Sequence, residues 1–245
     1  MEVIYGRNTI LEALQAGRSI QRIFIAAGLP HKGSLAKLIA LAESRDVPVE
    51  EVERERLDKL APGSQGVCAE VKPFSYASLD DILAVSDKRK EVPFLLLLDR
   101  VQDVENLGSL LRTAEAVGVH GVIIPERRAA PVTPAVRKAS VGAVEHLLVA
   151  RVRNIAQTID VLKEKGIWVI GLENVPEAKR YDEIDFTGPL ALVVGSEGWG
   201  LRRLVREKCD LLAKLPMRGQ IGSLNAAVAG SIMLYWAWQM REQRP

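Results

Sequence analysis

The sequence contains few of the residues that form disulfides or metal sites. It has two cysteines, Cys68 and Cys209, far apart in the chain, and three scattered histidines. No pair of these residues has the spacing of a zinc site, and two isolated cysteines do not indicate a disulfide framework. We therefore expect neither a structural disulfide nor a bound metal ion.

Long apolar runs and aromatic residues are scarce as well. No apolar run reaches the roughly 18 residues that span a bilayer, and the first residues, MEVIYGRN, lack the basic-then-apolar pattern of a secretion signal. Aromatic residues make up only 5% of the chain, which argues against a wide stacking surface for single-stranded nucleic acid. These absences predict a cytoplasmic protein with no membrane partner.

The chain also lacks a large net charge, because 33 basic residues nearly balance 31 acidic ones. The basic residues are nevertheless unevenly distributed. Between residues 126 and 153 the only acidic residues are Glu126 and Glu145, and the basic residues are Arg127, Arg128, Arg137, Lys138, Arg151 and Arg153. A second basic group is Arg202, Arg203, Arg206 and Lys208. Two such patches suit a polyanionic partner, and two solvated helix faces would give the same pattern.

The order of the expected elements is that of an α/β protein. Residues 1–73 form a small α/β unit, and residues 74–92, which contain the charged run DKRKE, are expected to be a linker with one short helical turn. From residue 93, buried strands are predicted by PFLLLLD, GVIIP, LLVARV, IWVIGL, LALVVG and LLAKLP. Their alternation with helices predicts a mostly parallel sheet with helices on both faces.

Ligands of such sheets bind beyond the carboxyl ends of the strands, and three strand ends here are unusually polar. After PFLLLLD, Asn106 precedes a helix expected over 107–117, and Arg112 lies off the apolar stripe of that helix. Asn106 suits a helix N-cap. An arginine in this place can hold a phosphate, form a surface ion pair, or lie along the surface with its charge in water.

The other two polar strand ends lie in the C-terminal part of the chain. The glycines of GSEGWG, residues 195–200, allow a sharp turn and a close approach to a ligand. A dinucleotide-binding loop, as in a dehydrogenase, would need an acidic residue near the end of the next strand. That strand ends in Lys214, Leu215 and Pro216. Ser223 is then expected to cap a last helix over 223–243.

Taken together, these segments resemble the SpoU/TrmH family of RNA ribose 2′-O-methyltransferases. The matching motifs are Asn106-x-Gly108-x-x-x-Arg112-Thr113-Ala114, Gly195-Ser196-Glu197-Gly198, Leu215-Pro216 and Ser223-Leu224-Asn225. The resemblance covers residues 93–245, as a catalytic domain. It extends to residues 1–73, which look like the family's RNA-binding domain with the fold of a kink-turn-binding ribosomal protein. It also implies a trefoil knot at the C-terminal end of the sheet.

The resemblance implies methyl transfer from S-adenosylmethionine to the ribose 2′-hydroxyl of a guanosine in 23S ribosomal RNA, with transfer RNA as the alternative substrate. Ile4-Tyr5-Gly6 and Glu12-Ala13-Leu14 resemble the ribosomal branch, although Ser64 stands where that branch usually has a histidine. The implied cofactor-binding residues are Gly195, Ser196, Glu197, Gly198, Leu215, Pro216, Ser223 and Leu224. The implied RNA contacts are Arg7, Arg127, Arg128, Arg137 and Lys138.

The implied catalytic residues are Arg112, Asn106, Glu197, Ser223 and Asn225. Because a guanidinium normally stays protonated, we expect Arg112 to bind the 3′ phosphate of the target nucleotide rather than to act as a base. The other four residues would orient Arg112 and the ribose, from the same subunit or from a partner.

The resemblance also implies a homodimer formed through the last helix. Residues 233–238, MLYWAW, would suit that interface, and they would equally suit core packing. A non-catalytic RNA-binding protein would share the basic patches of this chain. Titration with S-adenosylmethionine distinguishes it from a methyltransferase.

Overall fold

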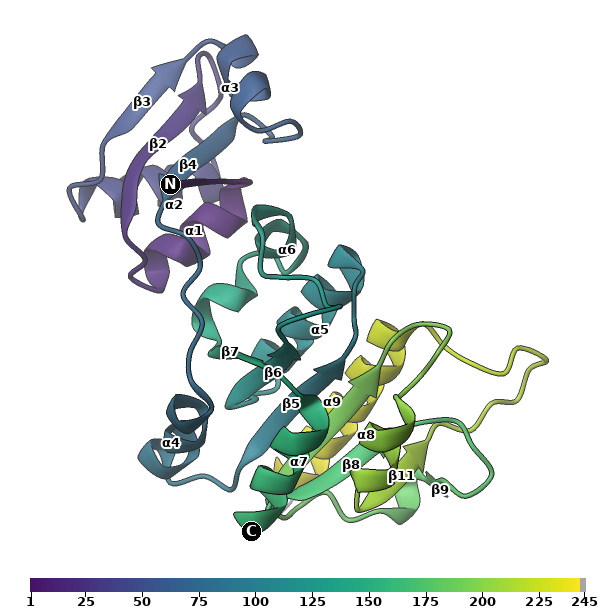
Figure 1. Cartoon of the computed structure of the whole chain (residues 1–245). Coiled ribbons are helices and arrows are strands. Elements are labelled where there is room, and N and C mark those ends of the chain that lie inside the picture. Colours follow the sequence, from purple (N-terminus) through teal and green to yellow (C-terminus); the bar gives the residue numbers. More distant parts are fainter. Residues whose placement is uncertain (243–245) are drawn as a thin grey trace. The chain divides into compact units, whose positions relative to one another are not determined.

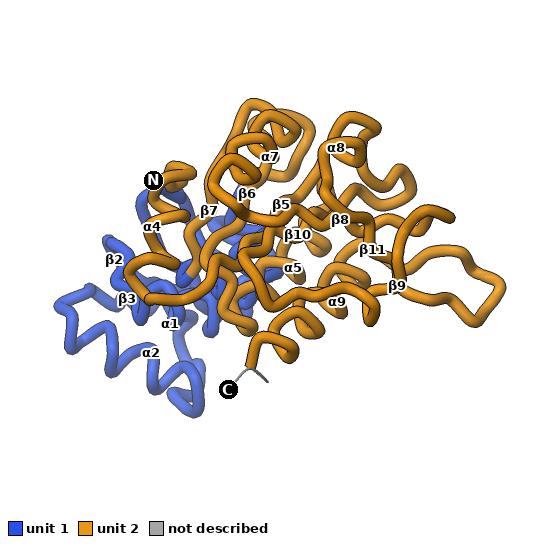
Figure 2. Tube along the Cα trace, turned by 90° about the horizontal axis from the view of Figure 1, so that it is seen from below, with its two compact units in different colours: residues 1–75, 132–146 blue, residues 76–131, 147–245 orange. Residues whose placement is uncertain are grey.

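The computed structural model describes residues 1–242 and divides into two compact units, which Figure 2 colours separately. The first unit contains Met1–Ser75 and Val132–His146, and the second contains Tyr76–Pro131 and Leu147–Pro245. Within the described residues, no helix is long and apolar enough to cross a membrane.

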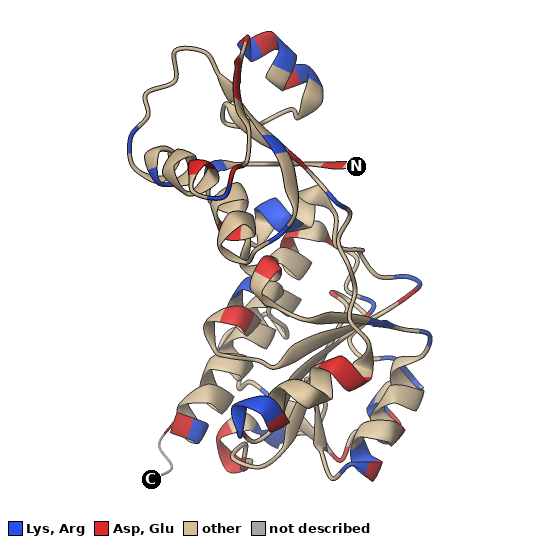
Figure 3. Ribbon diagram, turned by 90° about the vertical axis from the view of Figure 1, so that its left-hand side faces the viewer, with Lys and Arg blue, Asp and Glu red and all other residues tan. Residues whose placement is uncertain are grey.

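The first unit is built on a four-stranded sheet. In sheet order its strands are β1 (Glu2–Tyr5), β4 (Val67–Val71), β2 (Ile20–Ala26) and β3 (Val49–Val52). Its first three helices are α1 (Arg7–Gln15), α2 (Ser34–Glu43) and α3 (Arg54–Leu60). Apolar side chains of α1 and α2 pack on one face of the sheet, and α3 packs on the other. Basic and acidic residues alternate along α3 (Figure 3), as is typical of a solvated helix.

A segment from later in the chain completes this unit: α6 (Pro134–Ala139) and the 3-10 helix η1 (Ala143–His146) pack against β1 and α1. Gly142 is essential to this packing, because a Cβ at that position would lie 2.7 Å from the Cβ of Glu12. Thr133 caps α6, as the sequence predicts.

Arg137 of α6 differs from its expected role as an RNA contact. Its side chain is only 2% exposed, and its Nε lies 3.4 Å from the carboxylate of the fully buried Glu145. Glu145 also accepts a hydrogen bond of 2.8 Å from Arg18. Nη2 of Arg137 also lies 3.6 Å from the carboxylate of Glu2 on β1, so the guanidinium is an interior group that links the α6–η1 segment to the first unit.

The second unit is a parallel sheet, with seven strands among the described residues (Figure 1). In sheet order these are β7 (Val149–Val152), β6 (Gly121–Pro125), β5 (Phe94–Asp99), β10 (Leu190–Gly195), β8 (Trp168–Leu172), β11 (Leu211–Lys214) and β9 (Lys179–Arg180). Every neighbouring pair is parallel. Strands β5, β6 and β10 are buried along their whole length. The predicted α/β class with a mostly parallel sheet is confirmed.

Helices cover both faces of this sheet. The helices are α4 (Leu79–Arg89), α5 (Val104–Ala116), α7 (Ile155–Glu164), α8 (Arg203–Lys208) and α9 (Ala226–Glu242), with the short η2 (Tyr181–Glu183). Figures 1 and 2 show α7 and α8 on one face and α5 and α9 on the other. Gly230 lets α9 lie close to α5 and β10, because a Cβ there would come within 2.6 Å of Leu110 and 3.1 Å of Val194.

Helix α4 is longer than the sequence analysis predicted. A short turn and a solvated linker were expected, and the structure has an 11-residue helix. Ser78 and Asp81 form a capping box, in which each side chain accepts a hydrogen bond from the backbone nitrogen of the other residue. Ile82 is fully buried against β6, where a Cβ at Gly121 would lie 2.5 Å away. The capping box and the burial of Ile82 stabilise this helix, so the charged run that suggested a linker is part of a helix.

Two other helices begin at residues different from those predicted. Asp103, not Asn106, caps α5, and its Oδ1 accepts a hydrogen bond of 2.7 Å from the backbone nitrogen of Asn106. Asn225, not Ser223, caps α9, with its Oδ1 2.9 and 3.1 Å from two backbone nitrogens of the first turn. The side chain of Asn106 is therefore available for contacts inside the unit.

Candidate active site

A cavity of about 580 Å³ lies at the carboxyl ends of β8, β10 and β11. The loops that follow these strands and the start of α9 form its walls. Its lining residues are Leu172, Glu173, Asn174, Val194, Gly195, Ser196, Glu197, Gly198, Trp199, Gly200, Lys214, Leu215, Met217, Gly222, Ser223, Leu224, Asn225, Ala226 and Ala229. Small-molecule sites typically measure about 300–1,000 Å³, so a nucleotide-sized ligand fits.

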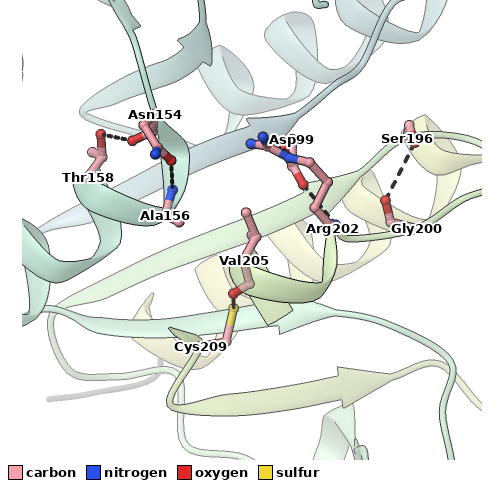
Figure 4. A network of polar contacts seen from close by, with 9 residues as sticks. All are labelled: Asp99, Asn154, Ala156, Thr158, Ser196, Gly200, Arg202, Val205 and Cys209. Atoms are coloured by element: carbon pink, nitrogen blue, oxygen red, sulfur yellow. Dashed lines mark hydrogen bonds and ion pairs between the residues drawn. The ribbon is translucent and has the colours of Figure 1, made fainter. Parts of the chain in front are cut away.

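The loop after β10 turns back on itself within five residues. Two backbone hydrogen bonds of 3.0 and 3.1 Å join Ser196 to Gly200, which face each other in Figure 4. Gly198 and Gly200 have φ angles of 79° and 63°, a conformation that favours glycine. At Gly195 a Cβ would lie 2.3 Å from the backbone of Gly200. The geometry of this turn therefore explains the glycines of GSEGWG.

Two carboxylates at strand ends hold this loop in place. Glu173, which follows β8, accepts a hydrogen bond of 2.8 Å from the backbone nitrogen of Leu201. Asp99, the fully buried last residue of β5, accepts bonds from the backbone nitrogen of Arg202 at 2.9 Å and from its Nε at 2.7 Å (Figure 4). Hydrogen bonds to a charged acceptor are short and strong. The loop is thus fixed to the strands on either side of β10.

Three residues from distant segments of the sequence are linked by hydrogen bonds beside the cavity. Asn106 donates from Nδ2 to Oε2 of Glu197 at 3.0 Å, and its Oδ1 accepts from Nδ2 of Asn225 at 2.8 Å. Asn106 is only 7% exposed, so both ends of a buried amide are satisfied. The orientation of Asn225 is fixed in turn by its cap on α9.

A second cavity, of about 670 Å³, adjoins the first. Its lining residues are Arg100, Val101, Gln102, Asp103, Asn106, Arg128, Ser196, Glu197, Trp199, Gly200, Leu201, Arg202 and Ala226. The two cavities share Ser196, Glu197, Trp199, Gly200 and Ala226. The first cavity therefore adjoins, along a shared wall, a cavity lined by three arginines.

The structure brings together most of the predicted site residues. The first cavity is lined by Gly195, Ser196, Glu197, Gly198, Leu215, Ser223, Leu224 and Asn225, and Asn106 lines the second. Pro216 is next to this set in the chain but is not among the residues described as lining either cavity.

Arg112 is the predicted catalytic residue that the single chain does not bring to either cavity. It is exposed on α5, and it forms no hydrogen bond or ion pair with any residue from 1 to 242. Six residues along an α-helix correspond to about 9 Å and about 240° of rotation. Arg112 and Asn106 consequently lie on different faces of α5.

The predicted RNA contacts are distributed over both units. Arg127 and Arg128 are exposed after β6, and Arg128 lines the second cavity. In the first unit, Arg7 is half-buried, and Lys138 donates a hydrogen bond of 3.0 Å to a backbone oxygen while lying 4.9 Å from the ring centre of Tyr5.

Several residues at these cavities were missed by sequence reasoning. Glu173 and Asn174 directly follow the apolar run IWVIGL, and Arg100 directly follows PFLLLLD. The position of these polar residues, directly after a buried strand, could have indicated that they line the site. For Trp199, the sequence shows a tryptophan inside a glycine-rich turn but not its exposure.

Comparison with known proteins shows two family matches. Residues 93–235 match the SpoU rRNA Methylase family, and residues 3–77 match the RNA 2′-O ribose methyltransferase substrate binding family. The chain is 44% identical over 241 residues to YacO of Bacillus subtilis (strain 168), which is named as a TrmH family tRNA/rRNA methyltransferase. That alignment covers 98% of this chain and 96% of YacO.

Solved structures are similar over nearly the whole chain. The SpoU methyltransferase AviRb from Streptomyces viridochromogenes, in complex with AdoMet, has a TM-score of 0.81 at 26% identity and covers 99% of this chain and 91% of its own. An AdoMet-bound rRNA methyltransferase from Sinorhizobium meliloti has a TM-score of 0.78 at 25% identity, with coverages of 100% and 88%. A TrmH/SpoU tRNA modifying enzyme from A. aeolicus has a TM-score of 0.55 at 28% identity, with coverages of 61% and 75%.

Proposed function

The chain belongs to the SpoU/TrmH family of S-adenosylmethionine-dependent RNA ribose 2′-O-methyltransferases, and we propose that its substrate is a guanosine in 23S ribosomal RNA. The extent of the structural likeness supports ribosomal over transfer RNA. The S. meliloti rRNA methyltransferase covers 100% of this chain, whereas the A. aeolicus tRNA modifying enzyme covers 61%.

The proposal is tested by mapping ribose methylation in ribosomal and transfer RNA from cells with and without this protein. We expect one 23S guanosine to lose its 2′-O-methyl group when the protein is absent, and purified protein to restore it on unmodified 23S transcript. Loss of a transfer RNA methylation instead would establish the alternative substrate and overturn the ribosomal assignment.

The first cavity has the features that S-adenosylmethionine requires. Its volume of about 580 Å³ suits a ligand of that size, and four of its lining residues are glycines, whose backbone N–H and C=O groups a ligand can approach closely. We assign its binding to Gly195, Ser196, Glu197, Gly198, Leu215, Pro216, Ser223 and Leu224. When bound, S-adenosylmethionine supplies a methyl group activated by a positively charged sulfur.

The chain's own residues must then position the ribose and stabilise the charge that develops on its oxygen. The ribose oxygen takes up the methyl group as the methyl–sulfur bond breaks, and the hydroxyl proton passes to solvent water. Orientation of the ribose and charge stabilisation are then the main requirements of the protein. Asn106, held between Glu197 and Asn225, can orient the ribose beside the shared wall of the two cavities. Arg112 keeps its positive charge, which suits it to bind the 3′ phosphate rather than to take up the proton.

A second copy of the chain would bring Arg112 to this site. Val228, Ile232 and Tyr235 form an exposed apolar stripe along α9, at 48%, 42% and 46% exposure, and such a stripe suits an interface. Helix α5 packs beside α9, where Thr113 and Ser231 share a hydrogen bond of 2.8 Å. We propose a homodimer through α5 and α9, in which Arg112 serves the partner's cavities.

Mixed dimers test this arrangement. An Arg112→Ala chain and a Ser223→Ala chain, each with low activity alone, are unfolded and refolded together. If the arginine acts across the interface, statistical mixing restores about a quarter of wild-type activity, because half of the dimers then contain one complete site. If the arginine acts within its own chain, no dimer contains a complete site and mixing restores nothing.

For the remaining assignments we propose that residues 1–73 bind RNA and that residues 74–92, which include α4, connect them to a catalytic domain at 93–245. We propose that this domain forms the trefoil knot, while its segment 132–146 packs in the first unit. Arg7, Lys138 and Arg127 would contact the phosphate backbone, which contributes affinity without sequence preference. Replacing Arg127 or Lys138 by Gln should therefore weaken binding of different RNAs by similar factors and lower the salt dependence. An effect confined to one RNA would contradict this assignment.

A further inference from the structure

Trp199 has an unusual environment for its size. Its side chain is 91% exposed, more than any other large apolar side chain among residues 1–242. Aromatic side chains of this size are normally half-buried or more. Nothing in the packing of the second unit therefore accounts for a tryptophan at the tip of this turn.

The backbone that carries Trp199 is nevertheless fixed. The Ser196–Gly200 bonds close the turn, and the turn is anchored through Leu201 to Glu173 and through Arg202 to Asp99. The indole is thus presented to solvent from a restrained loop. It also lines both cavities, so it stands at the wall they share.

The second cavity offers two guanidinium groups beside this indole. Of its three arginines, Arg202 is committed to Asp99. Arg100 and Arg128 form no hydrogen bond or ion pair with the part of the chain that the structure describes. Their backbones adopt left-handed φ angles of 65° and 61°, which are uncommon for arginine and are maintained where the surrounding structure over-determines them.

We infer that the second cavity binds a nucleotide of the RNA, with a base stacked on Trp199 and the adjoining phosphates held by Arg100 and Arg128. This inference rests on the proposed function. Bases that are splayed out of a helix stack on aromatic side chains in single-stranded RNA recognition, and guanidinium groups bind phosphate oxygens through paired hydrogen bonds. A nucleotide bound there would present its ribose at the wall shared with the methyl-donor cavity.

Replacement of Trp199 tests the stacking contact. The variants are Trp199→Ala and the aromatic Trp199→Phe. The matched control is Trp168→Ala, because Trp168 is also exposed, at 56%, but begins β8 at the end of the sheet away from the cavities. Each protein is assayed for kcat/KM with unmodified 23S transcript at saturating S-adenosylmethionine, or with the RNA that the wild type methylates if that is a transfer RNA.

We expect Trp199→Ala to lower kcat/KM for RNA by about 10- to 100-fold, the usual effect of losing one base stack, and Trp199→Phe to restore most of it. The Kd for S-adenosylmethionine, measured by calorimetry without RNA, should stay within twofold of wild type. RNA should quench the tryptophan fluorescence of wild type and of Trp168→Ala, and it should leave the remaining tryptophan fluorescence of Trp199→Phe largely unchanged.

Two results would overturn the inference. Unchanged kcat/KM in Trp199→Ala would exclude a stacking role, and a parallel loss of S-adenosylmethionine affinity would assign the indole to the cofactor instead. Failure of the wild type itself to methylate any RNA would refute the proposed function, and this outcome is distinct from both.

The arginines are tested separately by Arg100→Gln and Arg128→Gln, with Arg203→Gln as control. Arg203 is 81% exposed on α8 and lines neither cavity. Each cavity variant should weaken RNA binding severalfold and lower the slope of log Kd against log salt by about one. The control Arg203→Gln should leave the Kd and the slope close to their wild-type values. Equal effects of all three variants would show a general electrostatic contribution and refute a phosphate site in the cavity.

Discussion

The hydrogen-bonded position of Asn106 predicts that Asn106→Asp destabilises the second unit despite its nearly identical shape. The substitution removes the donor to Glu197 and places a second carboxylate oxygen about 3.0 Å from Oε2 of that residue. Loss of a hydrogen bond to a charged acceptor costs about 1.5–3 kcal/mol, and repulsion adds to this where the Asp stays ionised. We expect a total near 2–3 kcal/mol, which for a chain of this size lowers Tm by roughly 4–12 °C.

The second substitution Glu197→Gln should reverse most of this loss, because the new amide can donate to the introduced carboxylate. A double-mutant cycle measured by thermal unfolding should give a coupling of about 1.5–3 kcal/mol, within the range of directly bonded pairs. Asn154→Asp is the matched control: Asn154 uses only its Oδ1, as the cap of α7, so that variant should lie within about 0.5 kcal/mol of wild type. A coupling below about 0.5 kcal/mol would refute a direct Asn106–Glu197 interaction.

Three further predictions concern the loop anchors and a buried histidine. Arg202→Ala should lower the free energy of unfolding by about 3 kcal/mol, because the buried carboxylate of Asp99 loses its guanidinium partner and keeps only a backbone donor. Asp99→Asn in the same chain should recover part of the loss in urea titrations. Gly200→Ala should weaken S-adenosylmethionine binding, measured by calorimetry, at least about tenfold. The new Cβ would lie 2.4 Å from Oε1 of Glu173, and the φ angle of +63° disfavours alanine. Gly219→Ala is the control, because a Cβ at that position would meet no atom within 4 Å. Burial lowers the pKa of His120, although hydrogen bonding to Glu91 opposes this. The unfolded chain therefore binds the proton more readily, and the free energy of unfolding should fall by at most about 1.4 kcal/mol per pH unit as pH drops below about 6.5. A His120→Gln variant that keeps the same pH slope would contradict this cause.

The strands of the second unit were predictable because burial on both faces gives continuous apolar runs such as 94–99 and 190–195. The meeting of the three motifs was predictable from the rule that parallel strands end at one edge. The assignment of α6 and η1 to the first unit was not, since it depends on the tertiary contacts of Arg137 and Gly142 rather than on local pattern. Periodicity also cannot reveal which of two polar residues three positions apart caps a helix, as Asp103 and Asn106 show.

The distance of Arg112 from the cavities of its own chain follows from the geometry of its helix. Arg112 belongs to one motif with Asn106, but residues six positions apart on a helix are rotated by about 240° from each other and so lie on different faces. If Arg112 acts in the cavities of a partner chain, as we propose, the two residues come to one site. The exposed apolar stripe of α9 beside α5 is consistent with such an assembly.

The sheet order explains why the site is built from loops held by polar contacts. The chain runs outward from β5 to β6 and β7, resumes on the other side at β8, and returns to insert β10 between β5 and β8. The carboxyl ends of β5, β10 and β8 thus meet where the direction of winding changes, which leaves a crevice that no helix fills. Side chains at such a crevice cannot be fixed by apolar packing, so Asp99, Glu173 and Asn106 hold the β10 loop through directional hydrogen bonds. These bonds leave one large side chain of the loop, Trp199, without an intramolecular role, and this is the physical reason to seek its partner in the substrate.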